Sequence, residues 1–495
     1  MKNFGMKIIS LLRIIVIGSV FFWTTARSQS DLETAKNNFA QDPWLAHASL
    51  AISVTDLTNK QKIISHNDQI ALPPASTVKL FATASAFEIL GSDYCPITRL
   101  YGESPINKNG VIGGNLWIRG GGDISLGSRY YNEEGELDQF LHRWVDSLYT
   151  LGLRKIEGDI IGDGSEFGYQ GAPDGWNWGD MGNYYGAGPS GLPIYDNILR
   201  FYIQVAGKVG TRSTLLKVFP EIEGLRFNNY IEASSAKGDN SYVYGAPYSL
   251  DRFGTGYLPR NSSSFMVKGS LPDPELQFAS ELLRILKLKG IEVLGQAKPY
   301  RNMNQKPASM RYKYLNLIYS NSGRTVKSLC FWTNMKSVNV YAEQLIGLIG
   351  HESGFTGDTK SATEFLERYW SKRIQSDGLN LKDGSGLSRS NGITAANFCS
   401  LLEYMFSSKS AAEFRESLPV AGESGTLSSI CYGQTAHGRI WAKSGTMNKI
   451  KAYCGYVKTI TNKDLAFSII VNNYSCSTED IVKKIEVFMN AMARY

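Results

Sequence analysis

The sequence predicts a mixed α/β (α+β) fold, with an antiparallel sheet flanked by helices and a large β-rich inserted region. Strand-like alternation occupies both ends of the chain, at residues 49–66 and 439–473. Between about residues 100 and 300 the chain is rich in Gly, Tyr, Trp and Asn and has few long helical patterns. The 495 residues, 43% of them hydrophobic, supply enough apolar surface for one large or two ordinary domains.

The first 28 residues have the pattern of a secretory signal peptide. Lys2 and Lys7 precede an apolar stretch at 8–23, and a small-x-small cleavage pattern ends at Ser28. The apolar stretch is short for a membrane span, so we expect cleavage near Ser28 and export to the periplasm. A retained membrane anchor or a buried helix is the alternative interpretation.

The predicted catalytic domain begins with a β-hairpin and a helix. Residues 49–66 alternate apolar and polar side chains around a turn at 58–60. A Pro-Pro pair then breaks the chain, and residues 77–90 form a helix-like run that ends at Gly91.

The carboxyl end mirrors this layout. Three strand-like segments lie at 439–444, 450–459 and 465–473. Ser477 caps a final helix, with Asp480 at the third helical position. Both ends are therefore expected to form one sandwich that is split in the sequence.

The middle of the chain predicts a separate structural region. We expect the catalytic domain to comprise residues 29–100 and 301–495, with residues 101–300 as a β-rich insertion of one or two subdomains. Short strand-like segments at 113–118 and 156–161 support this division.

The charge of the chain argues against a nucleic-acid partner. Four basic residues and no acid lie in the leader, so removing it lowers the formal net charge from +7 to +3. No later segment is a sustained basic run or a Lys/Arg stripe with interleaved aromatic residues, which a phosphate-binding face requires.

The cysteines and histidines predict no metal site and no cofactor. The six cysteines lie far apart without a CxxC pair, and the five histidines are scattered without an HExxH motif. In an exported protein the cysteines are either buried free thiols or form one or two disulfides, whose pairing the sequence does not specify.

Ser76 and Lys79 form an S-x-x-K set at the start of the first predicted helix. Residues three apart share a helical face, so the Lys79 amine can reach the Ser76 hydroxyl and act as its base. The amino terminus of the helix adds a positive dipole where an oxyanion would form. The set is weak evidence by itself, because Ser234 and Lys237 also match it in a segment that resembles a surface loop.

Two further motifs follow in the chain. Ser337 and Asn339 form an S-x-N set that opens another helix-like run, whereas the S-x-N match at 65–67 precedes Ser76 and lies in the hairpin. Residues 443–445 form a K-S-G set on a predicted strand, the one K-[ST]-G match in the sequence. Its glycine lets a ligand approach the strand edge, and its ammonium and hydroxyl groups suit a carboxylate.

The order S-x-x-K, S-x-N, K-[ST]-G on helix, helix and strand is the signature of penicillin-binding proteins and class A β-lactamases. With the long insertion between the two serines and the blocks at 176–187 and 383–389, the chain resembles the low-molecular-mass class C penicillin-binding proteins. These are D-alanyl-D-alanine carboxypeptidases that also act as endopeptidases. The resemblance covers nearly the whole mature chain and implies the penicillin-binding-protein/β-lactamase-like sandwich.

The resemblance also implies a role for each motif residue. Ser76 would be the acylated nucleophile, Lys79 its general base, and Ser337 a proton relay towards the leaving amine. Asn339 would hold the substrate amide. The terminal carboxylate would be bound by Lys443, Ser444 and Thr446, with the backbone N–H groups of Ser76 and Thr446 as the oxyanion hole.

A side-chain pocket for diaminopimelate is implied in the same way. Arg389 would pair with the free carboxylate of that side chain, a bidentate task that suits a guanidinium. Trp176, Tyr184 and Met447 would line the pocket, and Asp180 is the candidate for the amine, because Gly179 stands where the family often has an acid. Ordinary packing for the aromatic residues and a surface salt bridge for Arg389 are the alternatives.

The resulting hypothesis is an exported serine DD-peptidase that acts on peptidoglycan stem peptides ending in D-Ala-D-Ala and is acylated by β-lactams. A β-lactamase or esterase on the same scaffold is one alternative, and a non-catalytic peptidoglycan-binding protein is another. A peripheral membrane contact stays open, and neither the oligomeric state nor the preference between carboxypeptidase and endopeptidase action follows from the sequence.

Overall fold

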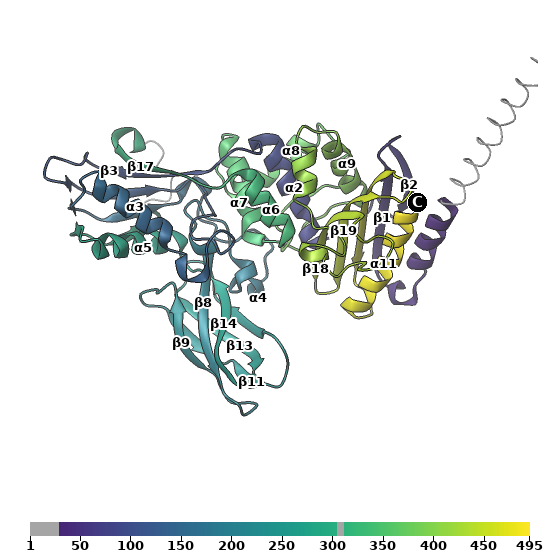
Figure 1. The fold of residues 1–495 in the computed structure, drawn as a ribbon, viewed down its shortest axis with the longest axis horizontal. Helices are drawn as coiled ribbons and strands as arrows, with labels where there is room; N and C mark the ends of the chain where they lie inside the picture. The colour runs from purple at the N-terminus through teal and green to yellow at the C-terminus, as the bar shows by residue number, and fades with distance from the viewer. Residues whose placement is uncertain (1–28, 304–310) are drawn as a thin grey trace, which may run out of the picture. The chain divides into compact units, whose positions relative to one another are not determined.

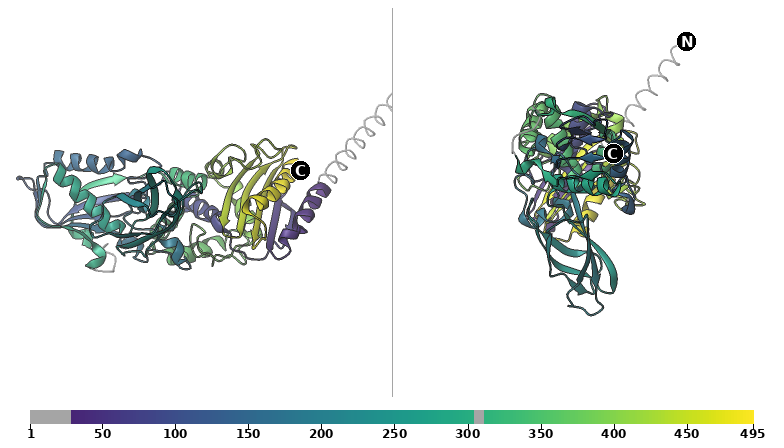
Figure 2. Two further views of the ribbon diagram at one scale, coloured as in Figure 1. Left: turned by 90° about the horizontal axis from the view of Figure 1, so that it is seen from below. Right: turned by 90° about the vertical axis from the view of Figure 1, so that its left-hand side faces the viewer.

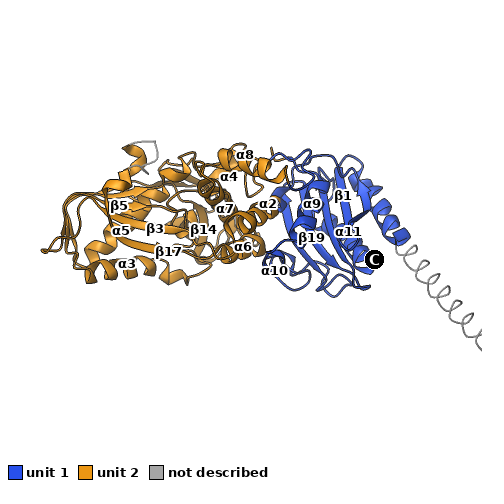
Figure 3. Cartoon of the chain, turned by 90° about the horizontal axis from the view of Figure 1, so that it is seen from above, with its two compact units in different colours: residues 1–77, 373–380, 392–495 blue, residues 78–372, 381–391 orange. Residues whose placement is uncertain are grey.

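The computed structural model describes residues 29–303 and 311–495, so the predicted signal peptide lies outside the described residues. The chain forms two compact units (Figure 3). Among the described residues, unit 1 consists of residues 29–77, 373–380 and 392–495, and unit 2 of residues 78–303, 311–372 and 381–391. These borders differ from the domain borders at residues 100 and 300 that the sequence suggests, which stay a prediction.

Unit 1 is built on a five-stranded antiparallel sheet to which both ends of the chain contribute (Figure 1). The strand order is β18-β19-β20-β1-β2, so the first hairpin continues the last three strands. Ile52 lies opposite Ile469 where the two ends meet. The predicted sandwich of both ends is thus confirmed. The strands are β1 (Ser49–Asp56), β2 (Gln61–His66), β18 (Ile440–Met447), β19 (Ile450–Lys458) and β20 (Asp464–Asn472).

Helices cover both faces of this sheet. Tyr453 and Val457 point into an apolar core that includes Phe488 of α11 (Thr478–Arg494). Alternation along β19 turns Tyr456 to the other face, where its hydroxyl donates to the Leu402 carbonyl of α9 (Ala395–Phe406) at 2.8 Å. Figure 2 shows the sheet and α11 from two further directions.

The remaining short elements of unit 1 lie in its connections. The N–H of Asp480 donates to the Ser477 hydroxyl at 3.1 Å, which confirms the predicted cap of α11. The short elements are η1 (Pro43–Leu45), η2 (Ala75–Val78), α10 (Ala411–Glu416) and η10 (Gly425–Leu427).

Unit 2 contains the helices that follow the first and second serine motifs. The helix predicted at 77–90 is found as α2 (Lys79–Ser85) and a π-helical turn, η3 (Ala86–Leu90), which ends at Gly91 with φ of +85°. The other helices of this group are α6 (Val326–Met335), α7 (Asn339–Glu352) and α8 (Thr359–Trp370).

Four small sheets make up most of the rest of unit 2, as the Gly-rich and aromatic-rich composition predicts. Their strand orders are β16-β7-β5-β3-β17, β15-β6-β4, β14-β8-β9 and β10-β13-β11, with β12 pairing β13. The strands are β3 (Ile97–Gly102), β4 (Val111–Ile112), β5 (Leu116–Arg119), β6 (Lys155–Ile156), β7 (Ile160–Asp163), β8 (Ile198–Val205), β9 (Thr214–Phe219), β10 (Arg226–Asn229), β11 (Glu232–Ser234), β12 (Asn240–Tyr244), β13 (Asp251–Pro259), β14 (Ser262–Ser270), β15 (Glu292–Val293), β16 (Ala297–Pro299) and β17 (Asn316–Ser322).

Two helices of this region were not predicted individually from the sequence. α3 (Gln139–Thr150) and α5 (Pro274–Leu288) pack through Trp144 and Phe278, whose ring centroids are 5.7 Å apart. Both helices have an apolar stripe that the surrounding Gly-rich composition hides. The short elements of unit 2 are η4 (Glu134–Glu136), η5 (Ser165–Phe167), α4 (Trp178–Met181), η6 (Tyr184–Gly186), η7 (Tyr195–Asn197), η8 (Tyr300–Asn302) and η9 (Arg311–Tyr314).

Two general features bear on the sequence predictions. Within the described residues, no helix combines the length and apolar character that a membrane span needs. All six cysteines are described, and none forms a disulfide; Cys95 is partly exposed and the other five are buried. The structure therefore favours the free-thiol interpretation.

Removing a core side chain of α11 tests the packing of unit 1. We expect Phe488→Ala to lower the free energy of unfolding by about 3–5 kcal/mol, because the buried ring leaves a cavity beneath the sheet. Denaturant titration measures this loss. Val487→Ala is the matched control, since the Val487 side chain is 64% exposed on the same helix, and equal effects of the two substitutions would contradict the assigned packing.

Candidate active site

Ser76 lies in η2, a single 3-10 turn that leads directly into α2. Ser76 is partly exposed, whereas Ala75, Thr77 and Val78 are buried. The Thr77 hydroxyl donates to the Pro74 carbonyl at 2.8 Å and fixes the turn. Ala75 has φ of +48°, in the left-handed region that costs a residue with a Cβ about 1–2 kcal/mol. Such strain is common at functional sites and here holds the hydroxyl-bearing residue at the surface of its turn.

The K-S-G strand β18 passes directly beside this turn. β18 is an edge strand of the unit 1 sheet. A Cβ at Gly445 would lie 2.7 Å from the Pro74 carbonyl oxygen and 3.1 Å from the Ser76 amide nitrogen. The glycine is therefore required by the close approach of two backbones, and this approach sets the strand edge against the amide of Ser76.

The polar side chains of β18 are engaged within unit 1. Lys443 is buried, and its ammonium donates to the Ser444 carbonyl at 2.7 Å. The Ser444 hydroxyl donates to the Thr426 hydroxyl at 2.8 Å, and Lys451 donates to the Thr446 hydroxyl at 2.7 Å. Burial lowers the pKa of Lys451 to about 8. Sequence reasoning missed Lys451, although its pairing with Thr446 follows from the tight turn between β18 and β19.

Lys79 is the most unusual ionisable group of unit 2. Its side chain is fully buried, and its Nζ donates to Asn339 Oδ1 at 2.7 Å and to the Ser385 carbonyl at 2.5 Å. Burial lowers the pKa of Lys79 to about 7, against the opposing charges of Asp383 and Glu343. A lysine with this pKa is an unprotonated amine in about half of the molecules at neutral pH, so it can accept a proton.

The S-x-N motif places its two polar residues at the start of α7. Asn339 accepts from Lys79 and donates through Nδ2 to the Tyr185 carbonyl at 2.8 Å, so its orientation is fixed. Ser337, two residues earlier, has φ of +56°. Ser337 is thus a motif residue with a Cβ in the left-handed conformation, and Ala75, which directly precedes the S-x-x-K motif, has the same conformation.

Two buried carboxyl groups shape the segment that binds Lys79. Glu343 accepts from the backbone N–H groups of Gly384 and Ser385 at 3.1 and 2.8 Å. Asp383 accepts from the N–H groups of Gly386 and Ser388, at 2.8 and 2.6 Å. Burial and the neighbouring Asp383 raise the pKa of Glu343 to about 8.

These carboxyl groups were not selected from the sequence. Asp383 is the first residue of the D-G-S-G-L-S-R block at 383–389. That block contributed to the resemblance to the class C penicillin-binding proteins, but no role was assigned to its acid. Glu343 lies on a helix that is buried on nearly all sides, where an acid without a structural partner would be costly. An acid in an otherwise apolar helical run is the signal that could have identified it.

One predicted pocket residue, Trp176, joins this network, and Tyr184 and Asp180 also lie in unit 2. Trp176 is buried, and its indole N–H donates to Asp383 Oδ2 at 2.9 Å. Tyr184 is 45% exposed, with the Lys268 ammonium 5.7 Å from its ring centroid. Asp180 accepts from the Asn177 amide at 3.4 Å and interacts with the Tyr185 hydroxyl.

Arg389 and Met447 stand apart from that network. Arg389 is exposed and makes no ion pair with any described acid, so the surface salt bridge considered from the sequence is not formed. Met447 ends β18 in unit 1, whereas Trp176, Tyr184, Asp180 and Arg389 belong to unit 2.

The structure thus assembles the predicted residues in two sets. Unit 1 brings the Ser76 turn together with Lys443, Ser444 and Thr446. Unit 2 brings Lys79 together with Asn339. The second S-x-x-K match, at 234–237, ends a strand in an exposed loop. No group of three or more His, Cys, Asp or Glu side chains in the described parts of the chain is arranged to hold a metal ion.

These features define a class of protein. Four features of this chain are typical of the penicillin-recognising serine enzymes. They are a serine on the turn before a helix, a buried lysine three residues later, an S-x-N turn, and a K-S-G edge strand on a helix-flanked antiparallel sheet. Residues 32–494 match the D-Ala-D-Ala carboxypeptidase 3 (S13) family, and the chain belongs to that family. It is a low-molecular-mass class C penicillin-binding protein with serine-type D-Ala-D-Ala carboxypeptidase activity.

Similar proteins agree with this assignment. The chain is 28% identical over 455 residues to a D-alanyl-D-alanine carboxypeptidase of Actinomadura sp. (strain R39), covering 88% of this chain and 80% of that one. It is 24% identical over 482 residues to the D-alanyl-D-alanine carboxypeptidase DacB of Haemophilus influenzae, with 92% and 95% covered. The crystal structure of penicillin-binding protein 4 from H. influenzae has the same fold, with a TM-score of 0.77 at 21% identity over 93% of this chain and 99% of that one.

The contact between β18 and the Ser76 turn can be tested by adding a side chain. We expect Gly445→Val to slow acylation by penicillin at least about tenfold, because its Cβ would overlap the Pro74 carbonyl and displace Ser76. Stopped-flow labelling with a fluorescent penicillin measures the rate. Gly135→Ala is the control, since no atom lies within 4 Å of a Cβ there, and an unchanged rate in Gly445→Val would contradict the close approach.

Proposed function

We propose that Ser76 is the nucleophile of the catalytic centre and that Lys79 is its general base. The observation that carries this proposal is the buried amine of Lys79, which has a pKa of about 7. Lys79 follows the partly exposed Ser76 by three residues in the sequence. A serine hydroxyl needs such a base to attack a carbonyl group.

Acylation then proceeds in balanced proton steps. Ser76 Oγ attacks the carbonyl carbon of the D-Ala-D-Ala bond while its proton moves to Lys79 Nζ. The oxyanion accepts hydrogen bonds from the N–H groups of Ser76 and Thr446, which the approach of β18 supports. As the C–N bond breaks, the proton passes from Lys79 through the Ser337 hydroxyl to the departing D-Ala amine, leaving an ester on Ser76.

Hydrolysis completes the cycle. A water molecule loses a proton to Lys79, attacks the ester, and releases the shortened stem peptide as Ser76 regains its proton. Cleavage of a cross-link is the same reaction, in which the leaving group is the amine of a diaminopimelate side chain. Endopeptidase action therefore needs no further catalytic residue. A β-lactam would acylate Ser76 in the same way, but its leaving amine stays tethered, which favours a long-lived adduct.

The substrate-binding roles follow the same division. Asn339, fixed by Lys79 and the Tyr185 carbonyl, would bind the substrate amide. Lys443, Ser444 and Thr446 would bind the terminal carboxylate. The exposed guanidinium of Arg389, without an ion-pair partner among described acids, would bind the diaminopimelate carboxylate. Trp176, Tyr184 and Met447 would be the lining residues, and Asp180 would bind the amine.

We place this enzyme in the periplasm, because peptidoglycan lies outside the cytoplasmic membrane and the first 28 residues have the pattern of a signal peptide.

Covalent labelling tests the assigned nucleophile. We expect fluorescent penicillin to label the wild-type protein in a stable adduct and Ser76→Ala to show no label, because the attacking oxygen is missing. Gel fluorescence and intact-protein mass measure the adduct. Ser234→Ala, in the second S-x-x-K match, is the control and should label normally. Label retained in Ser76→Ala would refute the assignment, and rapid loss of label from the wild type would instead favour a β-lactamase.

The pH dependence of acylation tests the base. The pKa of Lys79 is lowered, so the neutral amine is lost as the pH falls through about 7. The second-order rate of penicillin acylation should therefore be level at alkaline pH and fall about tenfold per pH unit on the acid side. Lys79→Arg keeps a positive charge without a usable base and should abolish acylation. A profile that stays flat from about pH 5 to about pH 9 would exclude Lys79 as the base.

A further inference from the structure

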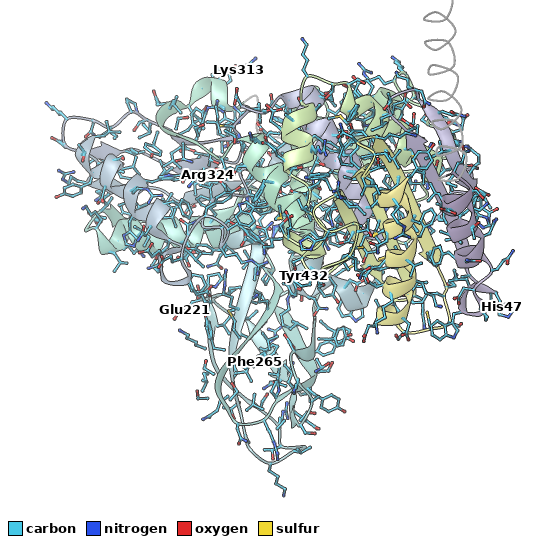
Figure 4. All side chains as sticks on the ribbon, turned by 45° about the vertical axis from the view of Figure 1, so that its right-hand side comes forward. His47, Glu221, Phe265, Lys313, Arg324 and Tyr432 are labelled. Carbon is cyan, nitrogen blue, oxygen red and sulfur yellow. The ribbon has the colours of Figure 1, made fainter. Side chains whose placement is uncertain are left out.

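Aromatic side chains of β12 and β13 form a row on the outward face of the sheet that these strands make with β10 and β11, and the proposed mechanism does not use this row. We call this the aromatic face; it is defined by Tyr242, Tyr244, Phe253 and Tyr257, with Trp178 of α4 at one end. Figure 4 shows the side chains of this part of unit 2, where Phe265 marks the neighbouring strand β14.

The register of the strands places these rings on one side. Tyr244 pairs with Phe253, Tyr242 with Thr255, and Asn240 with Tyr257, so alternate residues of β12 and β13 share the face. The intervening residues point inward. Val243 and Leu258, for example, are buried in the core of unit 2. The aromatic rings are thus the outer layer of this sheet.

The rings are exposed and ordered against one another. The side chains of Trp178, Tyr242 and Tyr257 are 51%, 50% and 52% exposed. Tyr244 and Phe253 stack with centroids 4.8 Å apart and planes 9° apart, and Trp178 lies 6.3 Å from Tyr244. Exposed aromatic groups in a contiguous row are unusual on a folded protein and indicate a binding surface.

The polar residues between the rings indicate the chemistry of the ligand. Amide and hydroxyl groups alternate with the rings at Asn228, Asn240 and Thr255. Arg226, the basic side chain of this face, is paired bidentately with Asp251 at 2.6 Å, so the face has no unpaired cation for phosphate. No Leu, Ile, Val or Met occupies the outward positions of the described strands β10 to β13, which argues against a lipid surface or an apolar protein partner.

Pyranose rings fit this pattern. The C–H groups on a sugar face are electropositive and pack on the negative face of an aromatic ring, while hydroxyl and acetamido groups take hydrogen bonds from amides and hydroxyls at the edge. Several rings in a row, separated by about 7 Å for each two-residue step along a strand, favour a linear polymer over a single sugar.

The aromatic face is continuous with the unit 2 part of the proposed site. Trp178 follows Trp176 by two residues, and the Trp176 indole donates to Asp383. Tyr185, whose carbonyl accepts from Asn339, lies close enough to Tyr242 for the two phenols to interact. A polymer on the aromatic face would therefore lie beside the bound stem peptide.

We propose that the aromatic face binds the glycan strand of peptidoglycan, a linear polymer of N-acetylated hexosamines, while an attached stem peptide occupies the catalytic centre. This inference rests on the proposed function, because it takes the stem peptide as the substrate. The face would hold an insoluble substrate by stacking and leave small soluble peptides unaffected.

Calorimetric titration with a β-1,4-linked N-acetylglucosamine hexamer tests the binding surface directly. We expect saturable binding by the wild-type protein and at least about tenfold weaker binding by the double variant Tyr242→Ser/Tyr257→Ser. Tyr432→Ser is the control, since Tyr432 is 70% exposed in unit 1, and it should bind as the wild type does. No binding by the wild type, or equal binding by the double variant, would overturn the proposal.

Enzyme assays separate this proposal from the proposed function. D-Ala release from isolated sacculi should be about tenfold slower in the double variant, while release from a soluble pentapeptide and labelling by penicillin stay unchanged and show that the variant is folded. Equal slowing on both substrates, or no slowing on sacculi, would overturn the glycan site. If the wild type neither cleaves the soluble pentapeptide nor takes the label, the proposed function fails, and the hexamer titration still decides whether the face binds glycan.

Discussion

The rest of the structure depends on the hydrogen bonds that hold the buried amine of Lys79. A lysine removed from water is stable only if polar groups replace its hydration, and the Asn339 amide and Ser385 carbonyl do so here. The Ser385 carbonyl is in turn positioned by Glu343, which binds the Ser385 N–H. The position of the Lys79 amine is therefore set by three elements that lie far apart in the sequence, α2, α7 and the segment that begins at Asp383.

The same constraint accounts for the two buried acids. Asp383 and Glu343 raise the pKa of Lys79, whereas burial lowers it. Burial has the larger effect, and the resulting pKa of the amine is about 7. Each acid also binds backbone N–H groups that would otherwise be buried without partners. The two acids thus stabilise the segment that begins at Asp383 and also set the pKa of Lys79, so a change in either acid would alter both.

The sequence predicts local features well and long-range ones poorly. The hairpin at 49–66 and the cap at Ser477 depend on neighbouring residues, and the assembly of both ends into one sheet follows from their matching strand patterns. Glu343 was missed because the backbone groups that it binds lie some forty residues away, which no local spacing reveals. Lys451 was missed although the tight turn between β18 and β19 places it opposite Thr446. The helices α3 and α5 were missed because the composition of the whole region outweighed their apolar stripes.

The pairing of β1 with β20 has a consequence for how the enzyme matures. β1 is synthesised early, but its neighbour in the sheet, β20, is completed only at Asn472, near the end of the chain. Until then β1 has an unpaired edge, and the Ser76 turn lacks the strand β18 that lies against it. Synthesis from the amino terminus thus produces the Ser76 turn long before the strand that lies against it. An incomplete chain would therefore lack the contact between β18 and the Ser76 turn, which forms only after the last hairpin has folded.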